Sequence, residues 1–124
     1  MNKMSKYKPH SVDIGPWGKI EQRYVDLIEH EWRVEPMLSL VQFIINNGYD
    51  KRLSGYTSLD RLVITIDDPA ESHRESLFIQ FNQHTRQWHF EYYSKPYDPV
   101  EMERYYPEEQ GIDKFCQFIE WLKW

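Results

Sequence analysis

Three short runs of β-branched and aromatic residues in the second half of the chain place the strongest constraint on its fold. The runs are RLVITI (61–66), SLFIQF (76–81) and WHFEYY (88–93). In the last run successive residues alternate between two sets of side chains, as in a strand with one buried face. The two connections are too short for a crossover helix, and short connections favour antiparallel pairing. The sequence therefore predicts a three-stranded antiparallel meander.

Helical spacing of apolar residues appears twice before these runs and once after them. The two N-terminal helices are expected at 19–32 and 36–47, after a Gly-Pro-Trp-Gly turn that ends at Gly18. Pro36 suits the first turn of the second helix, and Gly48 suits its end. The C-terminal helix is expected at 112–123. The acidic residues on the first helix are expected to face solvent: Glu21, Asp26 and Glu29.

These elements predict a single α+β domain at residues 14–124, preceded by a polar mobile tail at 1–13. The simplest architecture packs all helices on one face of the sheet. The chain has 124 residues, enough to bury a core without a staple, and its one cysteine leaves no internal disulfide. No run of 18 apolar residues is present, so no membrane span is expected. The expected location is the cytoplasm, and the free protein is expected to be a monomer.

The sequence carries no motif for catalysis or for a cofactor. It contains no G-x-S-x-G, no P-loop and no G-x-G-x-x-G. A structural zinc site usually shows cysteines and histidines at short spacing, whereas the five histidines of this chain are dispersed. They are His10, His30, His73, His84 and His89. We therefore expect no enzyme activity, no metal and no cofactor.

The charge distribution argues against nucleic acid as the partner. Residues 63–124 contain twelve carboxylates and six lysines or arginines. Binding to a phosphate backbone requires cations, so an acidic half-chain predicts a basic protein partner instead.

The stretch YYSKPYDPVEMERYYPEE (92–109) combines five tyrosines, three prolines and five carboxylates. It is expected to be a long connection without regular structure. Two interpretations remain open: its tyrosines anchor the connection to the core, or they form a protein-binding surface steered by the carboxylates. Tyr92 is assigned to the core by its alternation with Trp88 and Phe90. The predicted partner-binding residues are Tyr93, Tyr97, Glu101, Glu103, Tyr105, Tyr106, Glu108 and Glu109.

Residues 59–124 resemble the small immunity proteins of bacterial polymorphic toxin systems, including contact-dependent growth inhibition. The resemblance rests on LDRLVITIDDPAESHRESLFIQF, on WHFEYY, on the acidic connection and on the closing FCQFIEWLKW. It implies a non-enzymatic cytoplasmic inhibitor that binds one cognate toxin domain, and many such domains are basic nucleases.

Two other functional classes remain open. A small adaptor or chaperone-like module would bind an extended peptide at a free sheet edge. A small hydrolase that uses carboxylates or a histidine would need a concave pocket and a buried acid with a raised pKa.

Overall fold

The computed structural model describes residues 16–66, 75–95 and 98–124. The tail predicted at residues 1–13 lies outside these ranges. Three helices and five strands are described, with two short 3-10 turns. They follow one another as α1 (Pro16–Glu29), α2 (Glu35–Asn46), η1 (Tyr49–Lys51), β1 (Leu53–Ser58), β2 (Arg61–Ile66), β3 (Ser76–Asn82), β4 (Gln87–Tyr93), β5 (Met102–Pro107), η2 (Glu108–Gln110) and α3 (Gly111–Leu122).

The α+β class is confirmed, but the predicted strand count is wrong. The sheet has five strands in the order β1-β2-β3-β4-β5, and every neighbouring pair is antiparallel. The predicted meander of 61–66, 76–81 and 88–93 forms its centre. The two edge strands were missed, β1 within a segment expected to be a polar connection and β5 within the tyrosine-rich stretch.

Both missed strands lie at the edges of the sheet. An edge strand does not need an apolar side chain at every second position. β1 has the sequence LSGYTS, and its only fully buried side chain is Leu53. Gly55 brings β1 close to α1, because a Cβ atom there would lie 2.8 Å from Cζ2 of Trp17. β5 has the sequence MERYYP, and four of its six residues are exposed. Charged residues are common on edge strands because they discourage pairing with other chains.

The helix boundaries differ from the predicted ones by a few residues. Pro16 and Trp17, expected in a turn, form the first turn of α1, where proline is well tolerated. The helix ends at Glu29 rather than at residue 32, and Glu31 adopts a left-handed conformation with φ of 72°. Glu21, expected to face solvent, is fully buried and accepts a hydrogen bond of 3.1 Å from Gln42 on α2.

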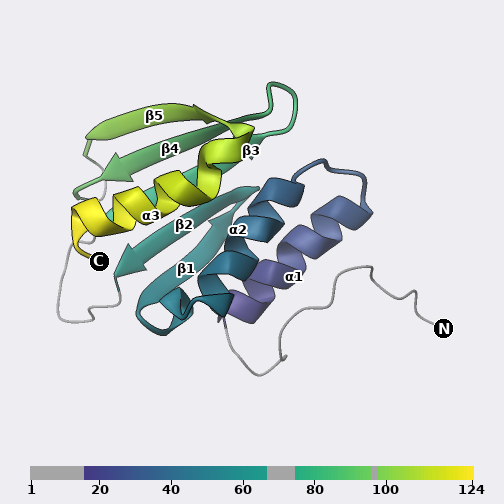
Figure 1. Cartoon of the computed structure of the whole chain (residues 1–124), viewed down its shortest axis with the longest axis horizontal. Helices are drawn as coiled ribbons and strands as arrows, with labels where there is room; N and C mark the ends of the chain where they lie inside the picture. Colours follow the sequence, from purple (N-terminus) through teal and green to yellow (C-terminus); the bar gives the residue numbers. More distant parts are fainter. Residues whose placement is uncertain (1–15, 67–74, 96–97) are drawn as a thin grey trace.

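The three helices cover one face of the sheet (Figure 1). The core lies between these two layers, and buried residues alternate along β3 and β4. On β2 four consecutive residues are buried, because Val63 and Thr65 are buried on the face away from the helices as well. Tyr92 is buried in the core, as expected. α3 contributes Phe118, whose ring stacks on Phe90 with 5.2 Å between centroids. No helix in the described part of the chain is long and apolar enough to cross a membrane.

Candidate functional site

The other face of the sheet is covered by no helix among residues 16–66, 75–95 and 98–124 (Figure 1). We call it the open sheet face and define it by the alternate strand residues that do not point into the core. They include Tyr56, Arg61, Phe78, His89, Glu91, Tyr93, Glu103 and Tyr105. Val63 and Thr65 of β2 share this face but are buried on it.

Phe78 and Tyr93 form a short row of two aromatic rings on the open sheet face. Phe78 on β3 contacts Tyr93 on β4, with 5.3 Å between ring centroids and near-perpendicular planes. The guanidinium carbon of Arg61 lies 4.7 Å from the centre of the Phe78 ring. Contacts of these kinds fix the rings by packing across strands. The row therefore presents preformed aromatic surface rather than flexible side chains.

A charged cluster occupies the part of the open sheet face formed by β4 and β5. His89 Nε2 lies 2.6 Å from Oε2 of Glu103 and 3.8 Å from Oε2 of Glu91. Arg61 lies 3.6 Å from the other oxygen of Glu91. Glu91 and Glu103 are direct partners in the β4–β5 register. Two like charges directly opposite each other destabilise a strand pair, so the Arg61 guanidinium beside Glu91 offsets part of that repulsion.

The tyrosine hydroxyls on this face respond to the same carboxylates. Partial burial raises the pKa of the Tyr93 phenol, and the negative charge of Glu91 raises it further. Partial loss of hydration and the charge of Glu103 raise the pKa of Tyr105. Both hydroxyls stay protonated at neutral pH, because a tyrosine pKa already lies near 10. The Tyr105 hydroxyl donates to Glu103 at 3.5 Å, and both hydroxyl oxygens can accept a hydrogen bond from a partner.

The structure distributes the eight predicted binding residues over different surfaces. Tyr93, Glu103 and Tyr105 lie together on the open sheet face, and Glu101 is exposed just before β5. Tyr97 lies outside the described residues. The remaining three lie elsewhere: Tyr106, Glu108 and Glu109.

Tyr106 points to the helix side of the sheet. Its ring packs at 5.5 Å from that of Phe90, and the Lys114 ammonium lies 5.0 Å from its centre. Tyr105 and Tyr106 point to opposite faces because side chains alternate along a strand. The sequence analysis expected a long connection here and assigned no strand to these residues. It therefore could not predict that Tyr105 and Tyr106 point to opposite faces.

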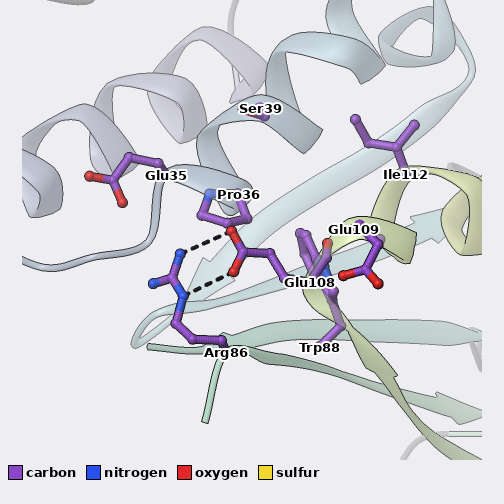
Figure 2. A pocket seen from close by; sticks show the side chains of 9 residues that line it. Glu35, Pro36, Ser39, Arg86, Trp88, Glu108, Glu109 and Ile112 are labelled. Carbon is purple, nitrogen blue, oxygen red and sulfur yellow. Dashed lines mark hydrogen bonds and ion pairs between the residues drawn. The ribbon is translucent and has the colours of Figure 1, made fainter. Parts of the chain in front are cut away.

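Glu108 and Glu109 line a pocket of about 470 Å³ between η2, the start of α2 and the β3–β4 turn (Figure 2). Arg86 makes a two-pronged ion pair with Glu108, with both N–O distances 3.1 Å, and also donates to the carbonyl of Arg33 at 2.8 Å. This hydrogen bond from Arg86 lowers the pKa of Glu108. A hydrolase would need the opposite shift, so Glu108 does not have the property of a general acid.

Sequence reasoning missed Tyr56, Arg61, Phe78, His89 and Glu91 as members of the candidate site. The alternation in WHFEYY was a usable signal for His89 and Glu91, since it placed them opposite the buried set. Their meeting with Glu103 depends on the pairing of β4 with β5. Nothing in the sequence of 102–107 indicated that pairing.

Comparisons of the chain with protein-family models, with curated proteins and with solved structures found no match.

Proposed function

We propose that this chain is a non-enzymatic immunity protein that binds and neutralises a basic toxin domain through the open sheet face. One observation carries the proposal: two well-exposed tyrosines share a sheet face with a pair of carboxylates, and no helix among residues 16–66, 75–95 and 98–124 covers that face. Tyr56 on β1 is 53% exposed and Tyr105 on β5 is 60% exposed. Glu91 lies on β4, between these two strands, and its partner Glu103 lies on β5 beside Tyr105. Tyrosine is enriched among the residues that dominate binding energy at interfaces.

Preorganisation supports this use of the sheet. Side chains on paired strands lose less conformational freedom on binding than side chains on a loop, so more of the contact energy appears as affinity. The Phe78–Tyr93 contact and the Arg61–Glu91 pair hold their side chains before any partner arrives.

Charge supports a basic partner. Residues 98–110, which include β5 and η2, contain five carboxylates and one arginine, a net charge of −4. Such a field accelerates encounter with a positively charged surface and disfavours acidic competitors. A basic nuclease domain has that surface around its substrate site. Binding there would block the substrate by occlusion, with no turnover by the inhibitor.

The test is co-expression of the chain with the C-terminal domain of a secreted toxin encoded beside it. Wild-type protein is expected to restore growth and to bind the purified domain. Tyr105→Ala and Glu103→Lys are expected to lose protection, and Glu103→Lys to slow association at least about tenfold at low salt. Glu29→Lys is the matched control, because it reverses an exposed charge on α1, away from the open sheet face.

Full protection by both Tyr105→Ala and Glu103→Lys would move the interface away from the open sheet face. Failure of the wild-type chain to bind or protect would reject the immunity function itself.

A second candidate function is an adaptor that binds an extended peptide, and one observation favours it. β5 is an edge strand, and a small hollow of about 170 Å³ lies between it and α3. A peptide strand added to β5 would place alternate side chains toward this hollow. Its lining residues are Met102, Tyr106, Gln117, Phe118 and Trp121. Binding of short unfolded peptides, and loss of that binding in Trp121→Ser, would favour the adaptor over the inhibitor.

A further inference from the structure

Three side chains with metal-binding atoms converge on the open sheet face, and the proposed partner binding does not explain their arrangement. His89 Nε2 and one carboxylate oxygen each from Glu91 and Glu103 all lie within 4.8 Å of one another. The shortest of these separations, from His89 to Glu103, is 2.6 Å.

The backbone brings the three groups together. His89 and Glu91 are two residues apart on β4, so they share a face of the sheet. Glu103 is the direct partner of Glu91 on β5, and Tyr105 is the direct partner of His89. Three ligands from two paired strands form a preset site rather than a chance meeting of flexible loops.

The ligand set indicates the class of metal. Zinc is held by imidazole nitrogen and carboxylate oxygen at about 2.0–2.2 Å, which places neighbouring ligand atoms about 3.4 Å apart in a tetrahedron. The separations in this cluster lie on both sides of that value, so rotation of the glutamate ends suffices to reach it. Calcium and magnesium prefer oxygen ligands alone, and a histidine nitrogen therefore favours zinc or a similar transition metal.

We propose that His89, Glu91 and Glu103 form a binding site for a divalent transition metal of the zinc class. The metal takes the place of the hydrogen bond between His89 Nε2 and Glu103. One or more coordination positions stay open toward solvent, because all three side chains are partly accessible.

The surroundings of the three ligands fit a metal site. The Tyr105 ring stacks on the imidazole of His89 and fixes its direction, and the Tyr105 hydroxyl lies 3.5 Å from the Glu103 oxygen that faces His89. Groups that orient the ligands in this way strengthen metal binding. The Arg61 guanidinium contacts the other oxygen of Glu91, so it leaves the oxygen nearer to His89 available.

A bound dication also removes the repulsion between Glu91 and Glu103. It ties the edge strand β5 to β4. Metal binding is therefore expected to stabilise the fold, since a ligand that binds only the native state raises the unfolding temperature.

The test uses the full chain after removal of metals with a chelator, titrated calorimetrically with zinc chloride. We expect saturable binding of one ion and a higher unfolding temperature. Cobalt(II) should give an absorption spectrum typical of tetrahedral nitrogen and oxygen ligands. His89→Ala and Glu103→Gln are each expected to weaken binding at least about tenfold, as losing even an outer-shell partner does. His84→Ala, in the exposed β3–β4 turn, is the control and should bind as the wild type does.

Circular dichroism checks that each variant is folded, and Glu91→Gln replaces any variant that is not. Absence of saturable zinc binding would reject the site. Unchanged affinity in both His89→Ala and Glu103→Gln, or a loss in His84→Ala equal to theirs, would place the metal elsewhere. The measurement uses the chain alone, so its result is independent of the proposed toxin partner.

Discussion

The imidazole of His89 lies flat against the ring of Tyr105, with 4.4 Å between the ring centroids and 2° between their planes. The two residues are direct partners in the β4–β5 register. This stack attaches the polar edge strand β5 to the sheet on the open side, where no helix in the described part of the chain supports it. It also points His89 Nε2 toward Glu103.

Removing the Tyr105 ring is expected to loosen β5. Tyr105→Ser should lower the free energy of unfolding by about 0.5–1 kcal/mol, the usual range for an aromatic cross-strand pair. Tyr105→Phe keeps the ring and should unfold like the wild type. Urea denaturation of the three proteins measures the difference. Equal losses in both variants would assign the effect to the hydroxyl instead.

Gly111 is required by packing rather than by backbone conformation. Its φ of −58° is ordinary for a helix, but a Cβ atom there would lie 2.1 Å from Cε2 of Trp88. The indole is held in place, since its N–H donates to the Glu108 carbonyl at 2.8 Å. Gly111→Ala should therefore destabilise the protein by about 3 kcal/mol, the upper part of the range for overpacking.

Gly48→Ala is the control for Gly111→Ala in thermal and urea unfolding. It has open space around the added methyl group but a left-handed φ of 81°. Its expected cost is about 1 kcal/mol, from the backbone alone. A smaller loss in Gly111→Ala than in Gly48→Ala would show that Trp88 moves aside freely.

The Arg86–Glu108 ion pair predicts a pH-dependent contribution to stability. Since Arg86 lowers the pKa of Glu108 in the folded state, the pair stabilises the protein above the unfolded pKa of the carboxyl, about 4.3. That contribution disappears as the pH falls through the lower, folded-state pKa. Because Glu108 is 44% exposed, the contribution at pH 7 should stay below about 1 kcal/mol.

The measurement compares the unfolding free energies of wild type and Glu108→Gln from pH 7 to pH 3. The difference is expected to be constant near neutral pH and to approach zero below pH 4. Glu109→Gln is the control, because it removes a neighbouring charge whose carboxylate points away from Arg86 (Figure 2). A difference between wild type and Glu108→Gln that grows as the pH falls would contradict the expected direction of this pH dependence.

Leu59 is a strained and exposed residue in the β1–β2 turn. Its φ is 60°, and its side chain is 81% exposed. Left-handed backbone is unfavourable for leucine, whereas glycine adopts it freely. Leu59→Gly should therefore raise the unfolding free energy by about 0.5–1 kcal/mol, after allowance for the greater freedom of glycine in the unfolded chain.

Leu59→Ala tests the explanation in the same thermal unfolding assay. It removes the exposed side chain but keeps a Cβ atom, so it should gain little. Equal stabilisation by alanine and glycine would show that exposure of the leucine, not its backbone, limits the stability of the turn.

The helices, β3 and β4 could be predicted from their periodic patterns, and β2 from its continuous run of apolar and β-branched residues. β2 was predicted at 61–66 and is observed at Arg61–Ile66, and β3 and β4 differ from their predictions by one residue at one end. β1 and β5 carry no such pattern. In β1, Gly55 leaves room for the Trp17 ring, and β5 is largely exposed. Burial therefore did not select alternating apolar residues in either strand.

The candidate site, too, was predicted only in part from the sequence. Composition alone singled out 92–109 as tyrosine-rich and acidic, and three of its residues do lie on the open sheet face: Tyr93, Glu103 and Tyr105. The separation of Tyr105 from Tyr106, and the meeting of His89 with Glu103, required the β4–β5 register. The sequence by itself determined the α+β class, the buried strands and the acidic character of the late segment, because local periodicity and charge encode them. Only the tertiary structure decided the two edge strands and the membership of the site, because pairing between strands decides which distant side chains share a face.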